Sequence, residues 1–142
     1  MTRRGEKIFK GSCAGCHTPP FYTNNKLIPA RGFTVPEDHK EKYDVMMVEI
    51  GTDPGLTLGT RRGTGYYKVP SLQGVWYRGP FEHNGSVATL EDWFDSKRLS
   101  AEYVPTGFKG YGMQTRAVRG HEFGLNLSTA DKRALIAFLR TL

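Results

Sequence analysis

The stretch Cys13-Ala14-Gly15-Cys16-His17 decides how this chain is interpreted, and it contains both cysteines of the sequence. Two thiols separated by two residues and followed directly by a histidine form the attachment sequence for c-type haem. On one helical turn each thiol can add to one vinyl group of the porphyrin, and the adjacent imidazole is then directed at the iron. The spacing therefore predicts that Cys13 and Cys16 hold haem c and that His17 is the first axial ligand.

Three other interpretations of this motif remain open. A thioredoxin-like thiol pair would stand in a βαβ unit, and the flanking segments show no strand pattern. A zinc site would need four ligands, typically with a second close pair, but His39, His83 and His121 are isolated in the sequence. A disulfide between the two cysteines would leave the adjacent histidine unexplained.

Length and composition predict a folded chain with many loops. The sequence has 142 residues, so we expect residues 1–142 to form a single domain. The 17 glycines and 8 prolines predict long ordered loops at residues 18–36, 51–85 and 97–124. Loops of this length are uncommon in a compact domain unless they serve a function. Long loops in a small helical protein are consistent with packing around a non-protein core.

Four segments are expected to be helical: residues 4–12, residues 38–50, a segment that begins at Thr89, and a terminal segment capped by Ser128. The terminal segment is the clearest, because apolar residues follow its N-cap at helical spacing as far as Leu142. The 38–50 segment has an apolar face, and we expect its Met46 and Met47 to fill the core. No convincing strand pattern occurs anywhere in the chain.

Charge and hydropathy restrict the partners and the location of the protein. The 20 basic and 14 acidic residues leave a net charge of +6, which favours a redox partner with an acidic face. A merely solvated basic surface is the alternative, and no nucleic-acid motif organises the scattered basic residues. The longest apolar run, residues 134–139, is far shorter than the ~20 residues of a membrane span. Residues 1–6 lack a signal-peptide pattern, so we expect either a cytoplasmic protein or an exported one whose leader has been removed.

Several other segments resemble a known superfamily. Residues 5–9, before the haem motif, resemble the opening of class I type cytochromes c. Three segments are similar to the C-terminal haem domain of bacterial dihaem cytochrome c peroxidases: residues 51–54, 67–72 and 80–90. Residues 120–124 and 135–142 resemble the branch of that superfamily that contains the rubber oxygenase. The resemblance implies an all-α cytochrome c fold, with four to five short helices and long loops around one covalent haem.

The sequence departs from the peroxidase pattern at two points. It has one C-x-x-C-H motif instead of two, and residues 93–98 contain no methionine where the peroxidases place an iron ligand. We therefore expect a periplasmic mono-haem cytochrome that carries single electrons between redox partners, and not an enzyme. Export is expected because haem c is attached in the bacterial periplasm. The alternatives are a haem domain of a larger dihaem peroxidase or oxygenase, which relays electrons to a second haem, and a haem sensor for a small gas.

The candidates for the second axial ligand are His39, His83, His121, Met46, Met47 and Met113. The Gly-His-Glu-Phe-Gly loop resembles the rubber-oxygenase branch, where the matching histidine looks like an iron ligand, so we expect His121, with Met113 as the alternative. His39 is expected to be a solvated surface histidine, and His83 to have a structural role near the haem. Arg78 is expected either to pair with a haem propionate or to be a plain surface arginine.

Overall fold

The computed structural model describes residues 1–59, 63–111 and 118–142. The α-helices in these ranges are α1 (Thr2–Ser12), α2 (Glu37–Lys42), α3 (Gly55–Gly59), α4 (Leu90–Trp93) and α5 (Thr129–Leu139). They are joined by the short 3-10 helices η1 (Val75–Tyr77) and η2 (Ser96–Leu99) and the strands β1 (Leu27–Pro29) and β2 (Tyr66–Lys68). The mostly helical, loop-rich architecture expected from the sequence is confirmed.

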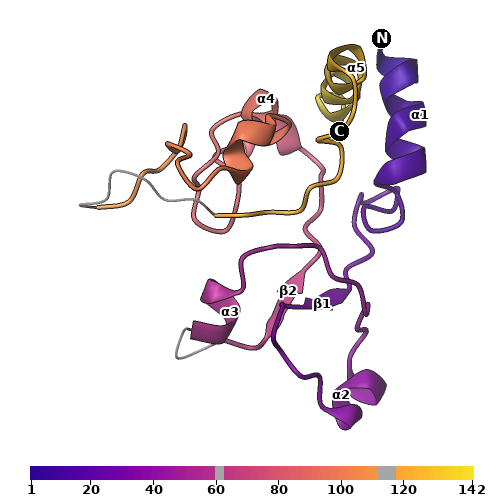
Figure 1. The fold of residues 1–142 in the computed structure, drawn as a ribbon. Helices are drawn as coiled ribbons and strands as arrows, with labels where there is room; N and C mark the ends of the chain where they lie inside the picture. The colour runs from indigo at the N-terminus through magenta and orange to yellow at the C-terminus, as the bar shows by residue number, and fades with distance from the viewer. Residues whose placement is uncertain (60–62, 112–117) are drawn as a thin grey trace.

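The two terminal helices, α1 and α5, lie side by side and form the centre of the apolar core (Figure 1). Gly5 of α1 allows the close approach, because a Cβ atom there would lie 1.9 Å from the carbonyl oxygen of Ala134. Phe9 packs on Phe138 with ring centroids 5.2 Å apart, and Leu135 is completely buried. The apolar stripe predicted for the C-terminal helix is therefore the face that meets α1.

Both predicted N-caps are confirmed. Ser128 caps α5 by accepting a hydrogen bond from the backbone N–H of Asp131. Thr89 and Asp92 form a reciprocal capping box at the start of α4, which satisfies backbone donors that a helix start otherwise leaves unpaired. Leu90 of α4 then joins the core, and the chain turns into η2.

The segment expected to be helical from residue 38 to residue 50 is helical only as far as Lys42, so the prediction was wrong beyond that point. Tyr43 is extended, and the backbone that follows pairs with Leu27, whose N–H donates to Asp44 and whose carbonyl accepts from Met46. Aromatic and β-branched residues at 43, 45, 48 and 50 favour this extended form. Met47, expected in the core, is 64% exposed.

The expectation that the chain has no strands was also wrong. Strands β1 and β2 form a small antiparallel sheet in which Leu27 pairs with Lys68 and Pro29 pairs with Tyr66. Ile28, at the centre of β1, is buried. Strands of three residues are too short to show the alternation by which strands are recognised in a sequence.

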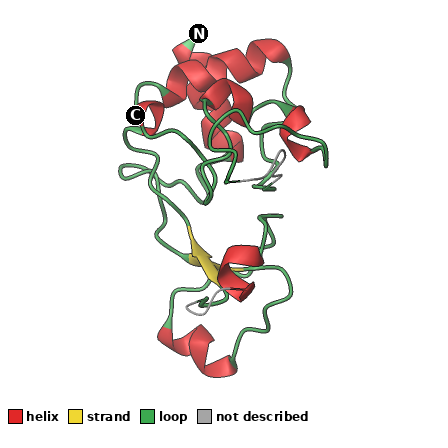
Figure 2. Ribbon diagram, turned by 90° about the vertical axis from the view of Figure 1, so that its left-hand side faces the viewer, coloured by secondary structure: helices red, strands yellow, loops and turns green. Residues whose placement is uncertain are grey.

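The molecule has a helical end and an end that contains the sheet (Figure 1). Helices α1, α4 and α5 gather at one end, whereas the sheet, α2 and α3 lie at the other (Figures 1 and 2). The C-x-x-C-H motif directly follows α1, so it lies where the chain leaves the helical end. None of the helices in the described ranges has the length and apolarity that crossing a bilayer requires.

Candidate haem site

The two cysteines lie on a turn that continues directly from α1. The backbone N–H groups of Cys16 and His17 both donate to the carbonyl of Cys13, so this turn holds the whole motif together. Both thiols are free and half-buried. Burial, together with the neighbouring Cys16, raises the pKa of the Cys13 thiol to about 11.

Cys13 lacks the low thiol pKa that the thiol-pair and zinc alternatives would favour. Reactive thiol pairs and metal-binding cysteines depend on the thiolate, which a raised pKa disfavours. Within the described ranges, no group of three or more His, Cys, Asp and Glu side chains could hold a metal ion. Covalent attachment of haem is the interpretation that uses both thiols and the adjacent histidine.

His17 is oriented by two backbone carbonyls. Its Nδ1 atom lies 3.2 Å from the carbonyl oxygen of Tyr22 and 3.1 Å from that of Pro70. A carbonyl can only accept, so the proton is on Nδ1 and the lone pair is on Nε2, the arrangement that a metal-binding imidazole needs. Burial lowers the pKa of His17, and the two carbonyl contacts oppose this shift.

His121 is enclosed by aromatic rings on two sides. Its ring centroid lies 5.2 Å from that of Trp93 and 5.3 Å from that of Phe123, and its Nδ1 atom is buried without a hydrogen-bond partner. Burial lowers the pKa of His121 to about 4, with further contributions from the charges of His17 and Arg98. The fold thus brings His121 within electrostatic range of His17, and both imidazoles are suited to the neutral form that binds iron.

A cavity of about 590 Å³ lies next to the motif and the His121 loop, but Cys13, Cys16, His17 and His121 do not line it. Its lining includes Ser12, which precedes the motif, Ile50 of the extended segment, and Phe123 and Leu127, which follow His121. Its volume is in the usual range of cofactor pockets, roughly 300–1,000 Å³. The free thiols, the oriented His17 and the unpartnered His121 nitrogen together fit haem c.

The other two histidines have aromatic partners. His39 was expected to be a solvated surface residue, and this was wrong: its Nδ1 lies 3.0 Å from the Tyr66 hydroxyl, and its ring packs edge-on against Tyr43. It is half-buried and belongs to α2, which lies at the sheet end of the molecule (Figure 1). His83 stacks on Tyr67 with ring centroids 5.6 Å apart and an interplanar angle of 9°.

The remaining candidates are in different environments. The exposed Arg78 donates to the carbonyl of Ser71, next to the carbonyl of Pro70 that orients His17. Met46 was expected to fill the core of a helix, but its Sδ lies 3.9 Å from the Sγ of Cys16, in the extended segment. Met113 lies outside the described residues.

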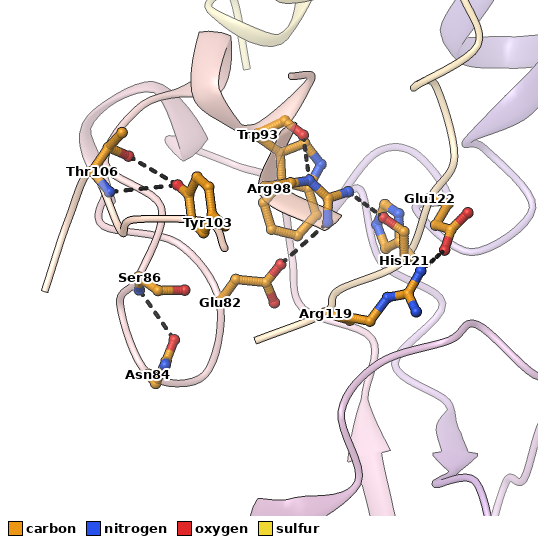
Figure 3. Close-up of polar contacts among 10 residues, drawn as sticks. All are labelled: Glu82, Asn84, Ser86, Trp93, Arg98, Tyr103, Thr106, Arg119, His121 and Glu122. Atoms are coloured by element: carbon orange, nitrogen blue, oxygen red, sulfur yellow. Dashed lines mark hydrogen bonds and ion pairs between the residues drawn. The ribbon is translucent and has the colours of Figure 1, made fainter. Parts of the chain in front are cut away.

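The sequence analysis missed two charged side chains beside His121 (Figure 3). Arg98 is completely buried and donates from Nε to the carbonyl of Trp93 at 2.7 Å and from Nη2 to the carbonyl of His121 at 2.5 Å. Its Nη1 lies 3.7 Å from a carboxylate oxygen of Glu82, which is 4% exposed. In the sequence, Lys97-Arg98 is indistinguishable from a surface charge pair, so no signal pointed to Arg98.

Comparisons with known proteins give a related family and three relatives for this chain. A family model described as RoxA-like, cytochrome c-like, matches residues 65–104, which contain β2, α4 and Arg98. The chain is 27% identical to the cytochrome-c peroxidase IdrP2 of Pseudomonas sp. (strain SCT), over 99% of this chain and 39% of that protein. It is 30% identical to the cytochrome-c peroxidase IdrP1 of Denitromonas iodatirespirans, over 63% of this chain and 29% of that protein.

A third relative, the cytochrome-c peroxidase IdrP2 of Denitromonas iodatirespirans, is 26% identical over 97% of this chain and 38% of that protein. The chain therefore spans about two fifths or less of the length of the curated relatives it matches. No solved structure matches the chain. The family model, the relatives and the helical fold agree: the chain is a c-type cytochrome domain with a cytochrome c fold, related to the RoxA-like cytochromes and the cytochrome-c peroxidases.

Proposed function

We propose that this chain is a mono-haem electron carrier: Cys13 and Cys16 hold one haem c, and His17 and His121 are its two axial ligands. When bound, haem c supplies an iron that accepts and releases one electron at a time. The main support is geometric: the carbonyls of Tyr22 and Pro70 orient His17, and His121 has a buried Nδ1 atom without a hydrogen-bond partner. The charge that His17 carries when protonated also lowers the pKa of His121, which places the two side chains near each other. With both axial positions taken by the protein, no substrate has access to the metal.

The chain's own residues prepare this site in two ways. The carbonyls of Tyr22 and Pro70 hold the Nδ1 proton of His17, so the imidazole does not need to change tautomer to act as a ligand. The low pKa of His121, about 4, keeps its imidazole neutral at any ordinary working pH. Neither histidine has to give up a proton to water when the site is formed.

The second candidate function is that of a haem domain in a larger peroxidase or oxygenase. One observation favours it: the relatives are named cytochrome-c peroxidases, and this chain spans only 29–39% of their length. In that case the same residues would relay electrons to a second haem. A second C-x-x-C-H motif in the full-length gene would support the enzyme, whereas a gene that encodes one motif would support the carrier.

The location and partner follow from the chemistry of the site. Residues 1–142 form one domain that works in the bacterial periplasm, because haem c is attached there. The net charge of +6 favours a redox protein with an acidic docking face. If this charge steers the partner, the association rate falls steeply between ~0.01 M and ~0.15 M salt, as the screening length shrinks from about 30 Å to about 8 Å.

The axial ligands are tested by paired substitutions. His121→Ala is expected to turn the ferric protein at least partly high-spin and to let carbon monoxide bind readily to the ferrous protein. Met113→Ala is the matched control and should leave both spectra unchanged. A methionine–iron charge-transfer band in the parent protein, or the opposite behaviour of the two variants, would show that His121 is not the ligand.

A further inference from the structure

We infer that Arg98 is the positioning residue for His121: its buried guanidinium fixes the His121 backbone to the end of α4 and so holds the imidazole at the iron. This inference rests on the proposed function, because it takes His121 as the second axial ligand. Arg98 contacts Trp93, His121 and Glu82, and its hydrogen bonds and ion pair do not involve Cys13, Cys16 or His17. It acts through the loop that carries the ligand.

Arg98 joins the end of α4 to two loops of the chain (Figure 3). Nε bonds the carbonyl of Trp93, at the end of α4; Nη2 bonds the carbonyl of His121, in the loop before α5; and Nη1 faces Glu82, in the loop before α4. The guanidinium also lies 4.7 Å above the Trp93 ring. That ring in turn packs against the imidazole of His121, so both the backbone and the ring of His121 are positioned through Arg98.

Only arginine can make this set of contacts. Its planar guanidinium carries five N–H donors in fixed directions, whereas lysine has one ammonium on a flexible stem. The carbonyls of Trp93 and His121 accept from two edges of this rigid fork, while Nη1 faces the Glu82 carboxyl group at 3.7 Å without a hydrogen bond. A lysine at residue 98 could reach one of these acceptors but could not hold the three segments in a fixed relation.

The residues around Arg98 leave room for its contact with Glu82. Glu82 adopts a left-handed backbone conformation with a φ of 68°, which is costly for a residue that has a side chain. Gly120, directly before His121, leaves room for the Glu82 carboxylate, since a Cβ there would lie 2.1 Å from its oxygen. Burying a charged pair is an inefficient way to stabilise a fold. We therefore assign this pair a role in geometry.

The exposed ion pair of the same loop cannot replace the buried contacts of Arg98. Arg119 and Glu122 form an ion pair on either side of His121, but each side chain is 57% exposed. Exposed ion pairs contribute little to structure, because solvent screens them and their long side chains lose freedom. The rigid connection between this loop and the helical end is therefore the buried one, through Arg98.

The test compares Arg98→Met and Arg98→Lys with two controls in the haem-loaded protein. Arg140→Met removes an exposed arginine that pairs with Glu91, and Leu135→Ala weakens the α1–α5 core without touching the loop. Two properties are measured for each variant: the urea unfolding midpoint, and the rate at which carbon monoxide displaces the distal ligand in the ferrous protein. The ferric spin state supplies an independent readout.

We expect Arg98→Met to bind carbon monoxide about tenfold faster than the parent or more, which corresponds to about 1.4 kcal/mol, since a loosened ligand leaves the iron more often. Arg98→Lys should be intermediate, Arg140→Met should match the parent, and Leu135→Ala should lose stability without a change in this rate. The lysine variant decides the question if Arg98→Met does not fold. A rate in Arg98→Lys equal to that of the parent would then overturn the inference.

The outcomes separate this inference from the proposed function. A parent protein without bis-histidine spectra contradicts both. A bis-histidine parent whose Arg98 variants lose stability but bind carbon monoxide at the parent rate contradicts the positioning role alone, and Arg98 is then a structural residue. Faster binding in Leu135→Ala as well as in Arg98→Met would also overturn the inference, because general loosening would explain both.

Discussion

The α1–α5 core and the His121 loop are held in place by different kinds of contact. In the core, apolar side chains such as Phe9 and Leu135 exclude water from a helix–helix interface. In the loop, a buried arginine directs hydrogen bonds to the carbonyls of Trp93 and His121. Apolar packing is non-directional and its free energy depends on buried area, whereas hydrogen bonds depend on the position of each partner.

The difference indicates a division of tasks. The core supplies stability at the helical end, and the loop supplies the geometry of one iron ligand. Changes in the core should therefore alter the free energy of unfolding and leave the haem spectrum alone, whereas changes at Arg98 should alter the haem spectrum as well as the free energy of unfolding. The following predictions test this separation, beginning with the largest effect.

Leu135→Ala is expected to lower the free energy of unfolding by about 3 to 4 kcal/mol, because it leaves a cavity at a completely buried position. The measurement is urea unfolding of the ferric protein, followed by circular dichroism. The low-spin ferric spectrum should remain that of the parent. A high-spin signal in this variant would show that the core and the ligand loop are coupled.

Glu82→Gln tests the buried polar cluster of Glu82 and Arg98 through the pH dependence of the free energy of unfolding. Burial raises the pKa of Glu82 from its ordinary value of 4.5 to about 7, although the Arg98 charge opposes the shift. The folded protein thus holds this proton more tightly than the unfolded chain. The stability contributed by Glu82 is complete below about pH 4.5 and is lost as the pH rises through about 7.

Relative to Glu82→Gln, the parent should therefore lose about 2 to 3 kcal/mol of unfolding free energy between pH 4.5 and pH 7, since one pKa unit corresponds to about 1.4 kcal/mol. Unfolding midpoints across this range give the difference directly. Glu91→Gln, at an exposed carboxylate, is the control and should follow the parent curve. Parallel curves for the parent and Glu82→Gln would mean that Glu82 is ionised throughout the range.

Gly5→Ala is expected to lower the free energy of unfolding by about 2 kcal/mol, because its Cβ would lie 1.9 Å from the carbonyl oxygen of Ala134. Gly11→Ala is a matched control in the same helix, with no atom within 4 Å of the added Cβ. That variant should gain about 0.5 to 1 kcal/mol from the lower flexibility of alanine. Equal effects of the two substitutions would rule out a tight contact at Gly5.

Ser128→Ala should have the smallest effect, a loss of about 1 kcal/mol, because it removes the acceptor for the Asp131 backbone N–H. Ser128→Gly should lose only a few tenths of this amount, since glycine is tolerated at an N-cap. Thermal unfolding resolves the two. A loss as large as that of Leu135→Ala would mean that the cap also controls how α5 docks on α1.

Several features of this protein could be predicted from the sequence because they depend on neighbours along the chain. The Cys13–His17 motif, the caps at Thr89 and Ser128, and the apolar stripe of α5 all involve residues within one or two turns. Each carries its own signal, and the structure contains the caps and the buried stripe. His121 as a ligand came from a family-like loop and stays a prediction, supported by its position near His17.

The extended segment after Lys42, the position of Met46 and the burial of Arg98 depend on contacts that the tertiary structure brings together. Residues after Lys42 are extended because the backbone of Leu27 offers them hydrogen bonds, and Met46 thereby reaches Cys16. Arg98 is read as a surface charge in the sequence, but the carbonyls of Trp93 and His121 make its burial possible. Local patterns determine which segments form helices and where the thiols lie, whereas the energy of a buried charge depends on acceptors that only the tertiary fold brings together.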